Sequence, residues 1–200
     1  MSRLLPRIDE PLTWRNPLVL TVGSVLSADE CAGLIDRIEM MEPEPAPVST
    51  HRGAVMMPRL RNNDRVMFDD PLLAALLLHR VRAHLPLRLE TDWVLSGANE
   101  RLRCYRYRPG QHFGPHFDGC FERSPTERSF LTFLVYLNTC EAGGATRFND
   151  LDLEVQPSTG AGLLFNHHLL HEGAPVLKGV KYVVRTDLLY RHDQNSSVNS

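Results

Sequence analysis

The spacing of apolar residues near the start of the chain changes from that of a strand to that of a helix. Residues 17–25 form a short apolar run bounded by polar positions, which predicts a β-strand. Ser27 and Glu30 then have the spacing of a capping box, in which each side chain accepts a hydrogen bond from the other residue's backbone amide. Apolar residues follow at helical spacing, so we expect a helix over residues 28–41 that packs one face inward.

A second helix is expected over residues 72–84. Asp70 can cap its amino end, and Pro71 suits a first turn, where no backbone donor is needed. The stretch between the two helices, residues 48–65, has no clear periodicity and is predicted to be a loop. We expect it to be able to act as a lid over a site.

From residue 92 onward the pattern is that of short strands. β-Branched and aromatic runs alternate with Gly, Pro, Asn and Asp. The expected strands cover residues 92–96, 100–107, 112–117, 129–138, 145–148, 152–156, 161–166 and 180–190. Many short strands separated by turn signals predict a mainly β fold, a jelly roll, with the two N-terminal helices bracing one sheet from outside.

This pattern predicts one folded domain with short extensions. Residues 1–16 are polar and interrupted by proline, and we expect them to form an N-terminal arm. The domain covers residues 17–192, in which residues 17–91 provide helical support and the lid loop, and residues 92–192 form the jelly-roll core. Residues 193–200 are predicted to be a polar tail.

Composition narrows the class of protein. Hydrophobic residues make up 42% and charged residues 23% of the 200 residues, as in ordinary globular proteins. The formal net charge of -2 argues against a nucleic-acid binder that relies on bulk electrostatics. The four cysteines form no C-x-x-C pair, and the N-terminus lacks the apolar core of a signal peptide. We therefore expect a cytoplasmic protein with free thiols that does not cross a membrane.

Two histidines and an aspartate form a candidate metal site. His116 and Asp118 are two residues apart, so on a strand both side chains project to one face. His171, which we expect on a facing strand, would complete a facial triad of the kind that binds non-haem Fe(II). His167 and His168 compete for this third position, but we expect both to lie in a loop and to face solvent.

A lysine, Lys181, follows the candidate ligand His171 in the sequence and is a candidate partner for an anion. Lys181 opens an apolar strand, where a buried charge needs an anionic partner. A dicarboxylate that chelates the metal at one end would offer its other carboxylate to this lysine. Tyr107 and Tyr136 are candidates to complete such a pocket with their hydroxyls; the alternative is that both are ordinary core tyrosines.

Four segments in the C-terminal part carry a family resemblance and cover about half of the chain. They are YRPGQHFGPHFDG (107–119), FLTFLVYLN (130–138), EAGGATRF (141–148) and HEGAPVLKGVKYVVRTDLLY (171–190). In their order and spacing they resemble the Fe(II)/2-oxoglutarate-dependent dioxygenases, and among these the prolyl 4-hydroxylase-like branch. The resemblance implies a double-stranded β-helix with His116, Asp118 and His171 on iron.

The resemblance also implies roles for the pocket residues. Lys181 would pair with the distal carboxylate of 2-oxoglutarate, and Tyr107 would hydrogen-bond the same group. Tyr136 would line the pocket, and Thr146 would border it. The implied cofactors are Fe(II), with 2-oxoglutarate and O2 as co-substrates and ascorbate as an accessory reductant.

The implied activity is hydroxylation of an unactivated C–H bond, with release of succinate and CO2. A prolyl or other side chain of a peptide or protein is the favoured substrate, and a free amino acid or small metabolite is the alternative. A cupin-like metal-binding sensor without oxygenase activity is the alternative from another class; it would leave Lys181 without a role. The alkylated-base repair branch has an arginine where this chain has Lys181, which argues against a nucleic-acid substrate.

The chain departs from the collagen-type members of the family at one position. They have a tryptophan six residues beyond the lysine, where this chain has Asp187. By strand parity Lys181, Arg185 and Asp187 share a face. Arg185 and Asp187 are therefore candidate substrate contacts; alternatively, they pair with each other at the barrel rim.

Two further arginines are candidate substrate contacts. Arg61 and Arg65 lie in the predicted loop over residues 48–65, which could close over a peptide. The alternative interpretation is a solvated connection in which both side chains face water.

Overall fold

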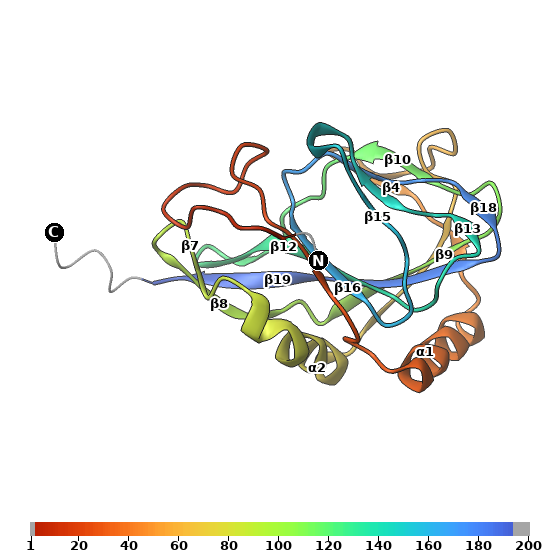
Figure 1. Cartoon of the computed structure of the whole chain (residues 1–200), viewed down its shortest axis with the longest axis horizontal. Coiled ribbons are helices and arrows are strands. Elements are labelled where there is room, and N and C mark those ends of the chain that lie inside the picture. Colours follow the sequence, from red (N-terminus) through yellow and green to blue (C-terminus); the bar gives the residue numbers. More distant parts are fainter. Residues whose placement is uncertain (1–2, 194–200) are drawn as a thin grey trace, which may run out of the picture.

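The computed structural model describes residues 3–193, and its centre is a pair of long antiparallel strands (Figure 1). Strand β12 (Glu127–Tyr136) pairs with β19 (Lys181–His192) along most of its length. They belong to an 11-stranded sheet whose main path runs β1-β2-β16-β12-β19-β9-β6-β3. The other strands of this sheet are β1 (Arg3–Leu4), β2 (Val19–Val22), β3 (Glu44–Pro45), β6 (Asp64–Asp69), β7 (Arg88–Leu89), β8 (Trp93–Ala98), β9 (Arg101–Tyr107), β11 (Glu122–Ser124) and β16 (Gly162–Asn166).

A 4-stranded sheet in the order β10-β17-β14-β15 forms the second layer. Its strands are β10 (Phe113–His116), β14 (Thr146–Phe148), β15 (Leu153–Val155) and β17 (His171–Gly173). Two short ribbons complete the strands: β4 (Val48–Thr50) with β5 (Gly53–Val55), and β13 (Ala142–Gly143) with β18 (Val176–Lys178). The mainly β architecture with flanking helices is confirmed.

The alternation of side chains along the central strands produces two cores. On β12, Phe133 and Val135 point into the core shared with the helices, whereas Leu134 and Tyr136 point into the core between the sheets. All four are buried, because both faces of this strand are covered. The core between the sheets is the one that leads to the candidate site.

Helices α1 (Ala28–Met40) and α2 (Pro71–Val81) cover the outer face of the large sheet, and a 3-10 turn η1 (Arg82–His84) extends α2 (Figure 1). Ser27 and Glu30 form the predicted capping box. At α2, the Asp70 carboxylate accepts the Leu73 amide and also a hydrogen bond of 2.7 Å from Arg37 of α1. Asp70 therefore caps one helix and ties it to the other.

The stretch 48–65 was wrongly predicted to be a loop throughout. It contains the β4–β5 hairpin, and Arg65 already belongs to β6. The sequence of β6 is too charged to predict a strand, but its two aspartates face arginines on β9. Asp64 pairs with Arg106 at 2.9 Å and Asp69 with Arg101 at 2.8 Å.

The terminal predictions fall partly on described residues. Residues 3–4 of the predicted arm form β1 against β2. Of the predicted tail, residues 194–200 lie outside the described residues. Among residues 3–193, no helix has the length and apolar character needed to span a membrane.

The shared role of Asp70 leads to a stability prediction. We expect Asp70→Ala to lower the free energy of unfolding by about 1–2 kcal/mol, because the helix cap is lost together with the Arg37 contact. Urea denaturation measures the change. Asp36→Ala, at an exposed position of α1, is the control and should leave stability nearly unchanged. Equal stability of the two variants would contradict the assigned role of Asp70.

Candidate metal centre

The two candidate histidine ligands are direct cross-strand partners. β10 pairs antiparallel with β17, and His116 lies opposite His171 with 4.2 Å between ring centroids. The expectation that His171 lies on a facing strand was wrong, because it comes from the neighbouring strand of the same sheet. Asp118 lies just beyond the end of β10, and its backbone amide donates to the His167 carbonyl at 3.2 Å.

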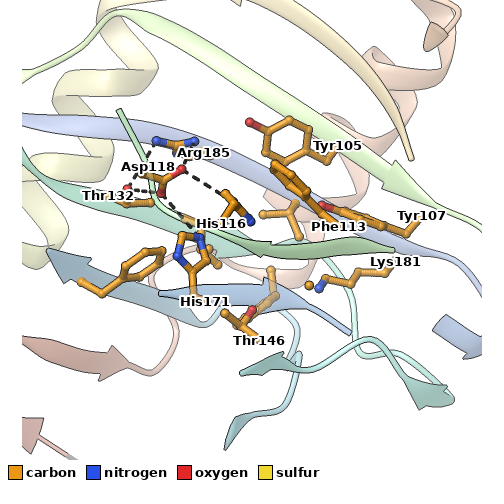
Figure 2. A pocket seen from close by; sticks show the side chains of 15 residues that line it. Tyr105, Tyr107, Phe113, His116, Asp118, Thr132, Thr146, His171, Lys181 and Arg185 are labelled. Atoms are coloured by element: carbon orange, nitrogen blue, oxygen red, sulfur yellow. Dashed lines mark hydrogen bonds and ion pairs between the residues drawn. The ribbon is translucent and has the colours of Figure 1, made fainter. Parts of the chain in front are cut away.

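The three side chains converge on a common point (Figure 2). Their potential ligand atoms all lie within 4.8 Å of one another. Asp118 Oδ1 is 3.8 Å from His116 Nε2, and Asp118 Oδ2 is 3.6 Å from His171 Nε2. This spacing brings two imidazole nitrogens and a carboxylate around one position.

Backbone carbonyls orient both imidazoles. His116 Nδ1 lies 2.9 Å from the Gly114 carbonyl oxygen, and His171 Nδ1 lies 3.0 Å from that of Leu169. A carbonyl oxygen only accepts, so each Nδ1 carries the proton. Each Nε2 therefore turns a lone pair toward Asp118, which is the arrangement that metal-binding histidines adopt.

The Asp118 carboxylate is held on both oxygens. The Thr132 hydroxyl donates to Oδ2 at 2.6 Å, and Arg185 Nη1 lies 2.8 Å from Oδ1. Burial acts to raise the pKa of Asp118, but the Arg185 guanidinium and the two candidate histidine ligands hold it well below its usual range. Asp118 is therefore an anion at neutral pH.

The histidines are neutral under the same conditions. Burial, with a contribution from His171, lowers the pKa of His116 to about 3, and burial also lowers the pKa of His171. Metal ligands must be deprotonated, and all three groups meet that requirement before any ion binds. Two neutral imidazoles, one carboxylate and no thiolate fit non-haem Fe(II).

Lys181 lies in the same cavity as the three candidate ligands. It is 3% exposed and is the direct cross-strand partner of Tyr107, so it lies in the large sheet and not in the sheet that carries His171. Its ammonium donates to the Gly144 carbonyl at 2.6 Å and lies over the Tyr107 and Tyr136 rings.

The charge of Lys181 has no counterpart. It forms no ion pair within residues 3–193, and burial lowers its pKa to about 8. A buried ammonium with a single neutral acceptor is costly, and an anion in the cavity would relieve that cost. The residues present therefore fit an anionic co-substrate such as 2-oxoglutarate.

Two glycines form the turn that contacts Lys181. Gly143 and Gly144 both have positive φ angles, of 75° and 73°. A Cβ at Gly143 would lie 2.3 Å from the Pro175 carbonyl oxygen, so no larger residue fits there. This left-handed turn directs the Gly144 carbonyl toward the lysine.

The remaining predicted pocket residues also line the cavity. The Tyr136 hydroxyl and Thr146 Oγ1 are 2.7 Å apart, and both side chains are buried beside Lys181. Burial raises the pKa of Tyr107 and Tyr136, so both stay protonated and can donate. The structure thus brings the four predicted co-substrate residues together in one cavity.

Sequence reasoning missed a hydrogen-bonded chain behind Asp118. His167 was wrongly expected to face solvent; it is 3% exposed, whereas His168 is exposed. Its Nδ1 lies 3.0 Å from Thr132 Oγ1, and its Nε2 lies 2.8 Å from Ser129 Oγ. Thr132 donates to Asp118, so it accepts from His167 Nδ1–H. Thr132 has the strand parity of Tyr136, and this signal could have placed it in the cavity.

Of the four tentative substrate residues, Arg61 and Arg185 line an outer cavity, whereas Asp187 and Arg65 line neither this cavity nor the inner one. Arg185 Nη2 is 3.0 Å from Asp187 Oδ1, so these two pair with each other. Arg103, which sequence reasoning also missed, pairs with the same aspartate: its Nη1 lies 2.8 Å from Asp187 Oδ2. Arg61 is buried against the Phe113 ring at the mouth, and Arg65 is partly buried on β6.

Comparison with known proteins matches the central strands to one family. Residues 102–186 match the model of the 2OG-Fe(II) oxygenase superfamily. Prolyl 4-hydroxylase subunit alpha-2 of Gallus gallus is 26% identical over 90% of this chain and 35% of its own length. Prolyl 4-hydroxylase subunit alpha-3 of Homo sapiens is 34% identical over 57% of this chain and 23% of its own length. The chain thus spans about a third or less of these curated relatives.

Solved structures share the fold. The viral collagen prolyl hydroxylase of Paramecium Bursaria Chlorella virus-1 superimposes with a TM-score of 0.64 at 23% identity, covering 86% of this chain and 96% of that chain. A prolyl-4-hydroxylase of Pseudomonas putida superimposes with a TM-score of 0.62 at 19% identity, covering 87% of this chain and 92% of that chain. The double-stranded β-helix expected from the sequence is confirmed.

Replacement of the candidate carboxylate ligand should weaken metal binding. We expect Asp118→Asn to weaken Mn(II) binding at least about tenfold, because the only anionic ligand of the triad is replaced by a neutral group. Isothermal titration calorimetry measures the affinity. Asp150→Asn, at an exposed position, is the control. Wild-type affinity in Asp118→Asn would exclude Asp118 as a ligand.

The buried neutral histidines also predict a pH dependence of stability. Burial lowers the pKa of His116 to about 3 and that of His167 to about 4. Below about pH 6.5 the unfolded chain binds more protons than the folded chain, so stability falls as the pH falls, by up to about 1.4 kcal/mol per pH unit and proton. In EDTA, urea denaturation between pH 7 and 4.5 should show this loss.

His167→Gln should reduce that slope, because one titrating group is removed. His51→Gln, on the exposed β4–β5 turn, is the matched control and should keep the wild-type slope. A stability that does not change between pH 7 and 4.5 would contradict the neutral burial of these histidines.

Proposed function

We propose that the protein is an Fe(II)- and 2-oxoglutarate-dependent dioxygenase, because residues 102–186 match the model of the 2OG-Fe(II) oxygenase superfamily. The proposed reaction hydroxylates an unactivated C–H bond of a peptide or protein side chain, with a prolyl residue as first candidate. The observation that carries the proposal is the buried, unpaired ammonium of Lys181 in the same cavity as His116, Asp118 and His171.

The residues of the chain divide the work between two ends of the cavity. His116, Asp118 and His171 would hold Fe(II) and leave the remaining metal positions open. Lys181 would bind the distal carboxylate of 2-oxoglutarate, with the Tyr107 hydroxyl beside it. Bound Fe(II), with 2-oxoglutarate and O2, supplies the chemistry that inserts one oxygen atom into a C–H bond and releases succinate and CO2.

The surrounding side chains position the ligands and exclude water. Thr132 and Arg185 fix both oxygens of Asp118, so its orientation is set before the metal arrives. The Phe113 ring stacks on the His116 ring with 3.5 Å between centroids, and the Phe165 ring packs against the His171 ring with 4.5 Å between centroids. These rings supply an apolar wall next to the two histidines.

Peptidyl proline is the first candidate substrate because the similar proteins are named prolyl hydroxylases. The curated relatives described above are named prolyl 4-hydroxylase subunits. A prolyl hydroxylase of Trichoplax adhaerens with the same fold is described in complex with a hypoxia inducible factor peptide fragment. A free amino acid is the second candidate, because the cavity of about 430 Å³ at the mouth holds a whole small molecule.

A metal-binding sensor without oxygenase activity is less well supported. It would use the three ligands but would leave Lys181 buried without an anion. Thermal stabilisation by 2-oxoglutarate in the presence of Mn(II) separates the two classes, because a ligand stabilises the state that it binds.

The central test is the loss of the pocket cation. We expect Lys181→Met to reduce succinate formation from 2-oxoglutarate at least about 100-fold and to leave Mn(II) affinity intact, because a charge-assisted contact to the co-substrate alone is removed. Lys178→Met is the matched control: Lys178 is the other lysine of the chain and is 75% exposed. A wild-type Michaelis constant for 2-oxoglutarate in Lys181→Met would refute the proposed role.

A further inference from the structure

A cavity of about 430 Å³ opens outside the candidate metal centre. It adjoins the inner cavity through His116 and Asp118, which line both. Its wall combines three aromatic rings with three guanidinium groups. These side chains are Phe113, Phe117, Phe121, Arg61, Arg103 and Arg185. A substrate that reaches His116 and Asp118 through this cavity would contact this surface.

The register of the large sheet concentrates arginines on this side. Arg103 on β9 lies directly opposite Arg185 on β19, and Arg65 on β6 lies opposite Tyr105. Arg103 and Tyr105 alternate with buried core residues and share one face of β9. Arg65, Arg103 and Arg185 therefore project from the same face of the sheet, and Arg103 and Arg185 line the outer cavity.

The carboxylates nearby do not balance these charges. Arg185 pairs with Asp118 and Asp187, and Arg103 pairs with Asp187. Arg61 and Arg65 form no ion pair within residues 3–193. Like charges that face each other across strands are destabilising, so this excess of positive charge has a cost for the fold. An anionic ligand would remove that cost.

Arg61 is held in place without an anion. Its side chain is 5% exposed, its Nε donates to Asn63 Oδ1 at 2.8 Å, and its Nη2 has no hydrogen-bond partner. Its Cζ lies 4.3 Å from the Phe113 ring centroid, and that ring stacks on His116. The Arg61 charge thus lies one ring away from a candidate metal ligand, with unused donor capacity.

We propose that Arg61, with Arg65 and Arg103 beside it, forms a carboxylate-binding subsite that selects the substrate. This inference rests on the proposed function, under which the substrate is an amino acid or a residue of a peptide. The carboxylate is the anion of that chemistry, and the planar guanidinium matches it with paired hydrogen bonds. The α-carboxylate of a free amino acid and an acidic side chain next to the hydroxylated residue are its two possible sources.

Matched pairs of probes test the subsite. The protein is loaded with Mn(II) and 2-oxoglutarate, and binding is followed by isothermal titration calorimetry. One pair is N-acetyl-L-proline and N-acetyl-L-prolinamide; the other is acetyl-Pro-Glu-amide and acetyl-Pro-Gln-amide. We expect the carboxylate member of at least one pair to bind at least about tenfold more tightly than its amide, because a charge-assisted contact is lost in the amide. The pair that discriminates identifies the source of the carboxylate.

Variants locate the effect. Arg61→Gln should bring the affinity of the preferred carboxylate probe down to that of its amide and leave the affinity for 2-oxoglutarate unchanged. Arg61→Lys keeps the charge but loses the paired donors, so it should retain part of the preference. Arg52→Gln is the matched control, because Arg52 is exposed on the β4–β5 turn and lies outside the cavity wall. It should behave as wild type.

If the protein binds 2-oxoglutarate, then equal affinities within both pairs would overturn the proposed subsite. The absence of binding by all four probes would overturn it as well. A preference that survives in a folded Arg61→Gln protein would overturn the role of Arg61. Failure of the wild-type protein to bind 2-oxoglutarate, measured before any probe is added, would instead refute the proposed function on which the subsite rests.

Discussion

The antiparallel register of β19 against its two neighbours decides which charged groups meet between the sheets. Against β9 it places Lys181 opposite Tyr107 and Arg185 opposite Arg103. Against β12 it places Asp187 opposite Thr132. A shift of one residue would turn all of these side chains into the core shared with the helices, where no ligand can reach them. The co-substrate pocket and the support of Asp118 therefore depend on a single alignment of strands.

That alignment creates an unequal distribution of charge along one strand. At its inner end, Lys181 is buried without an anion. Four residues later, Arg185 is buried between Asp118 and Asp187 and fixes the candidate metal ligand. The charge of Arg185 is paired with two carboxylates, whereas the charge of Lys181 has no carboxylate partner within residues 3–193. This difference separates a structural cation from a binding cation, although both lie on the same face of β19.

The mouth of the site contains a buried network of charges. The collagen-type resemblance suggests a tryptophan where Asp187 lies, and the structure shows why the change is tolerated. Asp187 is 1% exposed and takes up the charges of Arg185 and Arg103. The position is therefore part of a buried ion network and does not offer an aromatic surface to a peptide.

The sequence alone determined the elements whose signals are local. The capping box at Ser27 and the Asp70–Pro71 pair identified the two helices, and the spacing of His116, Asp118 and His171 identified the candidate ligands, because caps and ligand chemistry depend on residue type and short spacing. Parity placed Arg185 and Asp187 on one face of a strand.

Only the tertiary structure decided the features that depend on pairing between distant segments. It made β6 a strand by setting its charges opposite those of β9, and it buried His167 behind Thr132. It also placed His171 on the strand that pairs with the strand of His116, and not on a strand of the facing sheet. Lys181 lies in that other sheet. No local pattern carries this information, because the partner that stabilises each of these residues lies far away in the sequence.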